Sequence, residues 1–79
     1  MSTSEIKERA QAVFREVFEH PDLQISSEMT AQDVEGWDSL AHIKLILALQ
    51  KEFKLKLKAA DVVGIKNIGE LLDLIQNKT

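Results

Sequence analysis

The residues with the clearest potential for chemistry lie in the stretch GWDSLAHIKL, residues 36–45. Asp38 and Ser39 stand directly before an apolar pattern with helical spacing, and His42 follows Ser39 by three residues. Oxygen atoms in such a position can cap a helix, because the first backbone N–H groups of a helix lack partners. A serine and a histidine three residues apart can also meet on a helix surface, as a nucleophile and its base would. A third use of the hydroxyl is as an attachment point for another chemical group.

The catalytic use of Ser39 has the weakest support. The order of Gly36, Asp38, Ser39 and the following leucine is similar to the GDSL signature of one hydrolase family, but Trp37 interrupts it. The chain has no G-x-S-x-G nucleophile elbow and is too short for the later blocks that supply the helper residues of that hydrolase family. His42 also falls on the helix face expected to be buried. Catalytic residues are therefore not expected in this chain.

The attachment use of Ser39 agrees better with helix physics. Asp38 is sufficient as the helix cap, so the Ser39 hydroxyl is either a second structural group or free for modification. A phosphate ester on Ser39 would meet the positive end of the helix dipole, an interaction worth about 0.3–1 kcal/mol. The like charge of Asp38 opposes this effect, so the dipole alone does not account for the site.

Three segments of the chain repeat apolar residues at the spacing of an amphipathic helix. The first has three possible N-caps, Ser2, Thr3 and Ser4, of which Ser2 has a glutamate at capping-box distance. It is expected to end near His20, because Pro21 disfavours helical geometry in the residue before it. The second is expected over residues 38–53. The third is expected to begin after Asn67 as N-cap, again with a glutamate three residues later.

The connections between these segments differ in character. Residues 21–37 have no sustained periodicity and predict a long loop. Four apolar residues are expected to hold this loop against the core: Leu23, Ile25, Met29 and Val34. Residues 53–58 predict an extended connector, and residues 59–63 a short helical turn that ends at Gly64. The sequence therefore predicts a small all-α four-helix bundle, with three main helices, one short helix and a long first loop, as a single domain over residues 1–79.

The second predicted helix has two apolar faces. The face expected to point into the bundle consists of His42, Leu45, Ile46, Leu49 and Phe53. The opposite face consists of Leu40, Ile43 and Leu47, beside Lys44 and Lys51. An apolar stripe opposite the core is either a surface for a partner or is covered by a neighbouring element.

Composition excludes several classes of function. The chain has 79 residues and no cysteine, so a disulfide framework and a thiolate metal site are excluded, and its two histidines are too few for a zinc site. The net charge of −3 and the absence of arginine after Arg15 give no support to nucleic-acid binding. No apolar run approaches a membrane span and no apolar signal-peptide core is visible, so we expect a cytoplasmic monomer.

The sequence resembles the acyl carrier proteins, the phosphopantetheine-binding carrier family. The resemblance rests on Asp38-Ser39-Leu40, on IKLILALQKEF (43–53) and on IKNIGELLDLI (65–75), and it covers nearly the whole chain. It implies that a phosphopantetheinyl transferase attaches 4′-phosphopantetheine covalently to Ser39, with Asp38 and Leu40 beside it. It also implies that acyl groups are carried as thioesters between acyl-loading and acyl-using enzymes, while the carrier itself is not an enzyme.

The resemblance assigns a role to each face of the second helix. Leu40, Ile43, Lys44, Leu47 and Lys51 would contact partner enzymes. The acyl chain would insert among side chains of the other face: His42, Leu45, Ile46 and Leu49. His42 would make this interior more polar, which favours a short or polar cargo.

One departure from the family pattern concerns charge. Carriers of the main bacterial fatty acid synthase resemble one another in an acidic second helix, whereas here that helix carries Lys44 and Lys51 and is followed by three further lysines. The residues 1–38 hold three basic and nine acidic side chains, and residues 39–79 hold seven and four. We therefore expect a free-standing carrier of a specialised bacterial pathway, with fatty acid or polyketide chemistry. The alternatives are the housekeeping fatty acid synthase carrier and a small helical adaptor without a prosthetic group.

Overall fold

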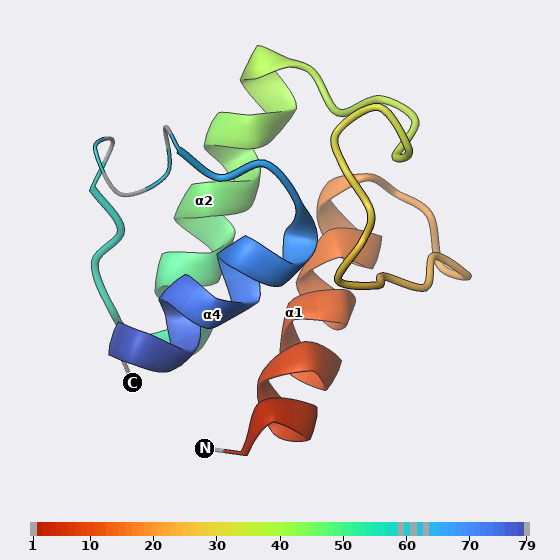
Figure 1. Cartoon of the computed structure of the whole chain (residues 1–79). Helices are drawn as coiled ribbons and strands as arrows, with labels where there is room; N and C mark the ends of the chain where they lie inside the picture. Colours follow the sequence, from red (N-terminus) through yellow and green to blue (C-terminus); the bar gives the residue numbers. More distant parts are fainter. Residues whose placement is uncertain (1, 59, 61, 63, 79) are drawn as a thin grey trace.

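The computed structural model describes residues 2–58, 60, 62 and 64–78. The described part contains helices α1 (Thr3–Val17), α2 (Ser39–Phe53) and α4 (Ile68–Lys78), and none of its residues forms a strand. Helix α4 packs across the bundle beside α1 and α2, and the long segment between α1 and α2 lies along one side (Figure 1). The predicted all-α class is confirmed. Residues 59, 61 and 63 of the short helical turn expected at 59–63 lie outside the described residues, and residues 60 and 62 are helical.

Helix α1 begins where the sequence predicts and ends earlier. The Ser2 hydroxyl accepts a hydrogen bond from the backbone N–H of the third helical residue, Glu5, at 3.2 Å. At the other end, the His20 N–H donates to the Arg15 carbonyl at 3.0 Å, and Glu19 adopts a left-handed conformation with φ 52°. This is the hydrogen-bond pattern of a Schellman motif, which ends the helix at Val17 before Pro21 takes effect.

One hydrophobic core joins the three helices and the long loop. It consists of aromatic and aliphatic side chains whose relative exposure is 8% or less: Ile6, Ala10, Val13, Phe14, Ile25, Leu45, Ile46, Leu49, Phe53, Leu57, Ile68, Leu71, Leu72 and Ile75. Every apolar side chain predicted to face inward on α2 is in this set. His42, the polar member of that predicted face, is half-buried.

The loop over residues 21–37 is a structural element that positions α4. Ile25 and Val34 are buried, and Leu23 and Met29 pack against the core, as predicted. The carbonyl of Met29 accepts from the N–H of Ile68 at 2.8 Å, so the loop satisfies N–H groups that a helix start leaves without partners. The loop is therefore attached to both the core and the beginning of α4.

The start of α4 is capped by the predicted residues. The Asn67 Oδ1 atom accepts from the Glu70 N–H at 2.8 Å, which confirms Asn67 as the N-cap. The Glu70 carboxylate accepts from the N–H of Lys66 at 2.6 Å, one residue before the position of a standard capping box. Two side chains thus define where the last helix begins.

The connector after α2 is non-helical and extended, as predicted. Lys54 ends α2 in a left-handed conformation with φ 54°. Leu57 is buried, and its N–H donates to the Gln50 side-chain oxygen at 3.2 Å, while Lys54, Lys56 and Lys58 are exposed. The period-two alternation of this segment therefore reflects one side packed on the bundle and one side in solvent.

Gly69 permits the close contact between the loop and α4, and this gives a test. A Cβ atom at Gly69 would lie 2.9 Å from the Ser27 Cβ and 3.0 Å from the Ser27 carbonyl oxygen. We expect Gly69→Ala to lower the free energy of unfolding by about 1–2 kcal/mol, because backbone must move to relieve the overlap. The matched control is Gly64→Ala, where no atom lies within 4 Å of the added methyl group. Urea denaturation followed by circular dichroism measures both, and equal stability of the two variants would contradict the contact.

Candidate functional site

Ser39 is the first residue of α2 and its side chain is exposed. Within the described part of the chain its hydroxyl makes no hydrogen bond. Asp38 is the N-cap: its Oδ1 accepts from the Ala41 N–H at 2.8 Å, and its carbonyl accepts from the His42 N–H at 2.9 Å. The capping function thus belongs to Asp38, and the Ser39 oxygen is left open to a modifying enzyme.

The backbone around Ser39 can accommodate a phosphate ester. The bonds to Asp38 leave the N–H groups of Ser39 and Leu40 without a partner among the described residues. These groups lie at the positive end of the α2 dipole, which attracts a negative group. The Asp38 carboxylate, already used by the cap, adds a like charge on one side. The site therefore fits a singly charged phosphodiester on an exposed oxygen.

A tight turn delivers the chain to this helix start. The Trp37 N–H donates to the Val34 carbonyl at 3.3 Å, and the Asp38 N–H donates to the Gly36 carbonyl at 3.0 Å. Gly36, at the third position of the first turn, has φ +85°. This conformation favours glycine, because other residues meet a steric penalty there. Gly36 thus reverses the chain just before the attachment candidate.

Trp37 anchors the start of α2 to the end of α1, a role that the sequence interpretation missed. Its ring packs edge-on against Phe14 with centroids 5.6 Å apart and against Phe18 at 5.7 Å, and these two phenylalanine rings are 5.8 Å apart. Aromatic pairs in this range add to the burial energy. The sequence feature that could have revealed this role is a lone tryptophan directly before a helix cap, together with two phenylalanines on the apolar stripe of the first helix.

His42 is paired with Trp37 rather than with Ser39. The two rings are nearly parallel, with centroids 6.1 Å apart and an interplanar angle of 19°. The Trp37 Nε1–H donates to His42 Nδ1 at 3.2 Å. In the described part of the chain no hydrogen bond joins His42 to Ser39. The serine–histidine pairing considered for an esterase is therefore absent from this arrangement.

A hollow of about 610 Å³ lies beside α2 and brings together members of both predicted groups. His42 and Ile46, from the predicted acyl-binding face, line it together with Ile43 and Leu47, from the predicted partner face. The remaining lining residues come from the α2 end and the following segment: Gln50, Leu57, Val62 and Ile65.

Leu45 and Leu49 were predicted, with His42 and Ile46, to face the interior where an acyl chain would insert, and that acyl contact stays a prediction. Both are 0% exposed and belong to the core, and neither lines the hollow beside α2. Leu45 and Leu49 therefore face the interior, as predicted, and lie deeper than the residues that line the hollow.

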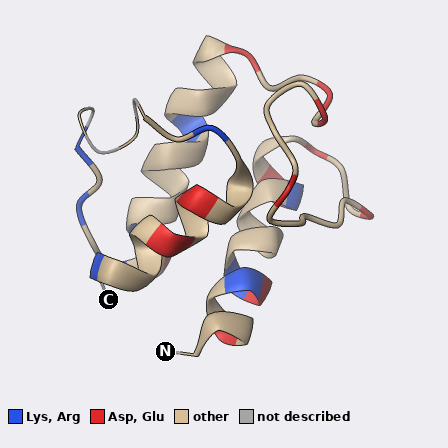
Figure 2. Cartoon of the chain, viewed as in Figure 1, with Lys and Arg blue, Asp and Glu red and all other residues tan. Residues whose placement is uncertain are grey.

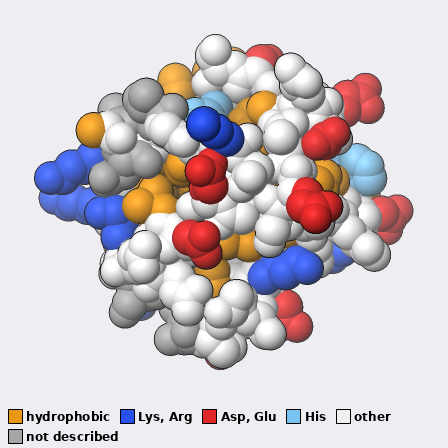
Figure 3. Space-filling view, in the orientation of Figure 1, with side chains coloured by type: hydrophobic (Ala, Val, Ile, Leu, Met, Phe, Trp, Pro, Cys, Tyr) orange, Lys and Arg blue, Asp and Glu red, His pale blue; other side chains and the backbone are white. Residues whose placement is uncertain are grey.

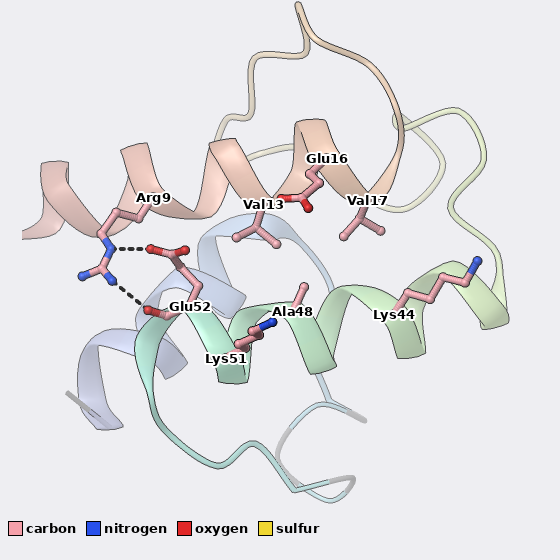
Figure 4. A pocket seen from close by; sticks show the side chains of 8 residues that line it. All are labelled: Arg9, Val13, Glu16, Val17, Lys44, Ala48, Lys51 and Glu52. Atoms are coloured by element: carbon pink, nitrogen blue, oxygen red, sulfur yellow. Dashed lines mark hydrogen bonds and ion pairs between the residues drawn. The ribbon is translucent and has the colours of Figure 1, made fainter.

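The apolar stripe on the outside of α2 is exposed. Leu40, Ile43 and Leu47 are 61%, 57% and 60% exposed, so no element among the described residues covers them. Lys44 and Lys51 are also exposed and line a groove of about 660 Å³ between α1 and α2 (Figure 4). The stripe thus has a groove lined by basic and acidic side chains on one side and the apolar hollow on the other.

The carboxylate on α2 that could offset the positive charge of these lysines already has a partner. Glu52 pairs with Arg9 of α1 through an Nε–Oε2 contact of 2.8 Å, and its carbonyl accepts from the same guanidinium at 2.7 Å. The Arg9 guanidinium also lies 5.0 Å from the centre of the Phe53 ring. The lysines of the connector after α2 lie on one side and the carboxylates of the long loop on the other, so the uneven charge along the sequence is also uneven in space (Figures 2 and 3).

Two searches of the described residues gave negative findings. No group of three or more histidine, cysteine, aspartate or glutamate side chains there could hold a metal ion. None of the helices in residues 2–58, 60, 62 and 64–78 combines the length and apolarity needed to cross a membrane.

Comparison with known proteins places this geometry in a family. The family model described as "Phosphopantetheine attachment site" matches residues 8–75. An acyl carrier protein of Thermosynechococcus vestitus is 30% identical over 99% of this chain and 96% of its own length. Another, of Saccharopolyspora erythraea, is 31% identical over 94% of this chain and 78% of its own length. The solution structure of a holo acyl carrier protein from Geobacter metallireducens matches 90% of this chain and 82% of its own with a TM-score of 0.84 and 34% identity.

The aromatic anchor of α2 gives a second test. We expect Trp37→Ala to lower the free energy of unfolding by about 2–4 kcal/mol, because it removes packing against Phe14 and Phe18 and leaves a cavity. Leu40→Ala, three residues away on the exposed stripe, should change stability by no more than about 0.5 kcal/mol. Chemical denaturation followed by far-ultraviolet circular dichroism compares them. A Trp37→Ala variant as stable as Leu40→Ala would show that the aromatic cluster does not hold the helix start.

Proposed function

The chain belongs to the acyl carrier proteins, the family with a phosphopantetheine attachment site, and we propose that Ser39 is the residue that carries the group. The cofactor of this family is 4′-phosphopantetheine, bound covalently, and the carrier is not an enzyme. When bound, the cofactor supplies a terminal thiol that holds acyl groups as thioesters. Family membership excludes both the esterase and the adaptor without a prosthetic group.

The observation that carries the assignment is the open Ser39 hydroxyl at the beginning of α2. It is exposed, free of hydrogen bonds within the described residues, and next to two unpaired backbone N–H groups. In the attachment reaction, the Ser39 oxygen forms a bond to the pantetheine-bearing phosphorus of coenzyme A. The bond from that phosphorus to the adenosine bisphosphate portion breaks, and the hydroxyl proton leaves to a base of the transferase or to water.

The neighbours of Ser39 hold it in place for this reaction. Asp38 secures the first turn through its bond to the Ala41 N–H, and Trp37 fixes the turn to the end of α1. Leu40, directly after Ser39, is exposed and offers an apolar contact to the transferase. A rigid, protruding helix start lowers the entropy cost of docking, because fewer groups must be ordered when the partner binds.

The exposed face of α2 is the proposed docking surface for the enzymes that load and use the carrier. It consists of Leu40, Ile43, Lys44, Leu47 and Lys51. An exposed apolar stripe with charged neighbours is the composition expected of an interaction site. Because Glu52 is paired with Arg9, the exposed charge beyond the first turn of α2 is positive, and the complementary partner surface is acidic.

This charge favours a specialised bacterial pathway over the housekeeping fatty acid synthase, which remains the second candidate. Housekeeping carriers resemble one another in an acidic second helix that basic partner patches recognise, and Lys44 and Lys51 would repel such patches. A cytoplasmic location and a monomeric state remain predictions.

The hollow beside α2 is the proposed place where the acyl group is sheltered. His42 and Ile46 line it directly, and both belong to the face predicted to receive the cargo. Leu45 and Leu49 lie beneath this surface in the core, so a chain would reach them only if the bundle opened. The hollow is therefore a surface site, which favours a short cargo.

The attachment residue can be tested by mass measurement. Incubation of the chain with coenzyme A, magnesium and a broad-specificity phosphopantetheinyl transferase should add the mass of one phosphopantetheinyl group. Ser39→Ala should gain nothing. Ser4→Ala, which removes another exposed hydroxyl from the first turn of a helix, should be modified like the unaltered chain. Modification of Ser39→Ala would place the attachment on another residue.

The partner surface can be tested by charge reversal. A malonyl transferase of a bacterial fatty acid synthase should load the unaltered chain poorly, and Lys44→Glu should raise the rate by about 10-fold at low salt through faster association. Lys7→Glu makes the same charge change on α1 and should have little effect. Equal rates for all three proteins, at the level of an acidic housekeeping carrier, would contradict the proposed pathway class.

The apolar part of the surface predicts a separation of folding from recognition. Ile43→Glu should leave the helical signal and the free energy of unfolding unchanged within about 0.5 kcal/mol, because the side chain is 57% exposed. The same variant should slow transfer by the phosphopantetheinyl transferase about 10-fold or more, since it places a charge in the docking contact. Circular dichroism and time-resolved mass measurement report the two effects. Loss of helical signal would show that Ile43 supports the fold instead.

A further inference from the structure

His42 stands where three hollows of the surface meet. It lines the apolar hollow beside α2 and a second hollow of about 540 Å³ that contains Ser39. It also lines a small one of about 90 Å³ next to Ile65 and Asn67. Ile43 is shared by the hollow that contains Ser39 and the apolar one, so these two adjoin along a wall made of His42 and Ile43. A group that is attached to Ser39 and extends into the apolar hollow passes His42.

Trp37 determines which nitrogen of His42 carries the proton. The indole N–H can only donate, so His42 Nδ1 must accept in the 3.2 Å hydrogen bond. The neutral imidazole then carries its proton on Nε2. The imidazole plane lies at 19° to the indole plane, so the two rings are nearly parallel. Trp37 is thus a positioning residue for the His42 Nε2–H donor.

The Nε2–H of His42 has no acceptor in the described part of the chain. The hydrogen bond to Trp37 uses the other nitrogen. His42 is half-buried, yet no buried side-chain nitrogen or oxygen atom among the described residues lacks a partner. The Nε2 atom is therefore reached by solvent at the surface of these hollows.

The rest of the apolar hollow offers few polar groups. Among its described lining residues the other polar side chain is Gln50, whose oxygen already accepts from the Leu57 N–H. The hydrocarbon part of an unsubstituted acyl chain, beyond the thioester carbonyl, would displace water from the Nε2–H and supply no acceptor, which is unfavourable for a covered donor. A chain with an oxygen atom near the thioester could accept this hydrogen bond and keep its carbons against Ile43 and Ile46.

We infer that His42 is a specificity-determining residue that selects hydroxyacyl or oxoacyl cargo over unsubstituted acyl cargo of the same length. The inference rests on the proposed attachment to Ser39. It requires His42 Nε2–H as donor, a carbonyl or hydroxyl oxygen of the cargo as acceptor, and Trp37 to hold the tautomer. No covalent step involves the imidazole.

The experiment uses the full chain, labelled with ¹⁵N and loaded by the broad-specificity transferase from butanoyl-, 3-hydroxybutanoyl- or 3-oxobutanoyl-coenzyme A. Intact mass shows whether loading occurs. Nuclear magnetic resonance of the imidazole nitrogens and the indole N–H reports the contact. The oxygenated cargoes should shift the His42 Nε2 signal and occupy the hollow at least about 5-fold more than butanoyl cargo. His42→Phe, which keeps a ring and removes the donor, should abolish this preference.

The outcomes separate the two proposals. A chain that gains no mass would overturn the attachment to Ser39 and this inference with it. A loaded chain in which butanoyl and 3-hydroxybutanoyl groups produce the same His42 shifts would overturn this inference alone, as would an undiminished preference in His42→Phe. Before loading, the unaltered chain should show the Nε2–H tautomer, and Trp37→Phe a mixture of both tautomers. A predominant Nδ1–H tautomer in the unaltered chain would also refute the inference.

Discussion

The packing of Trp37 between the end of α1 and the start of α2 is the contact on which the site depends. A carrier must present a hydroxyl in solvent and still hold it in one place, and an exposed residue cannot be held by its own burial. Here the neighbouring residue provides the hold: Trp37 packs against Phe14 and Phe18, while Asp38 closes the first turn and Ser39 stays free. Rigidity and accessibility are thus divided among three consecutive residues.

The same contact extends to the interior side of α2. Trp37 lies nearly parallel to His42 and donates a hydrogen bond to its Nδ1, so the anchor of the attachment site also orients the polar group at the edge of the hollow. On the outside of α2, the pairing of Glu52 with Arg9 ties the helix to α1 and removes a negative charge from the exposed face. Structural contacts in this small chain therefore also set the properties of both recognition surfaces.

The long first loop compensates for the small size of the bundle. A chain of 79 residues has few helices with which to close a core. Ile25 adds an apolar side chain to that core, and the carbonyls of Ser27 and Met29 bind the first N–H groups of α4. The close approach at Gly69 follows from this arrangement. The loop is therefore as much part of the packed structure as the helices that it connects.

The sequence by itself determined the features that depend on neighbours along the chain. Apolar periodicity, the caps Ser2, Asp38 and Asn67, and the motif around Ser39 were sufficient for the helices, the all-α class and the family. Only the tertiary structure decided which side chains lie close to one another, because the packing of the helices sets the distances between residues that are far apart in the sequence. The tertiary structure places Leu45 and Leu49 in the core rather than along the hollow. It also pairs His42 with Trp37 rather than with Ser39. It ended α1 at Val17, through a left-handed Glu19 that no residue-type preference favours as it would a glycine.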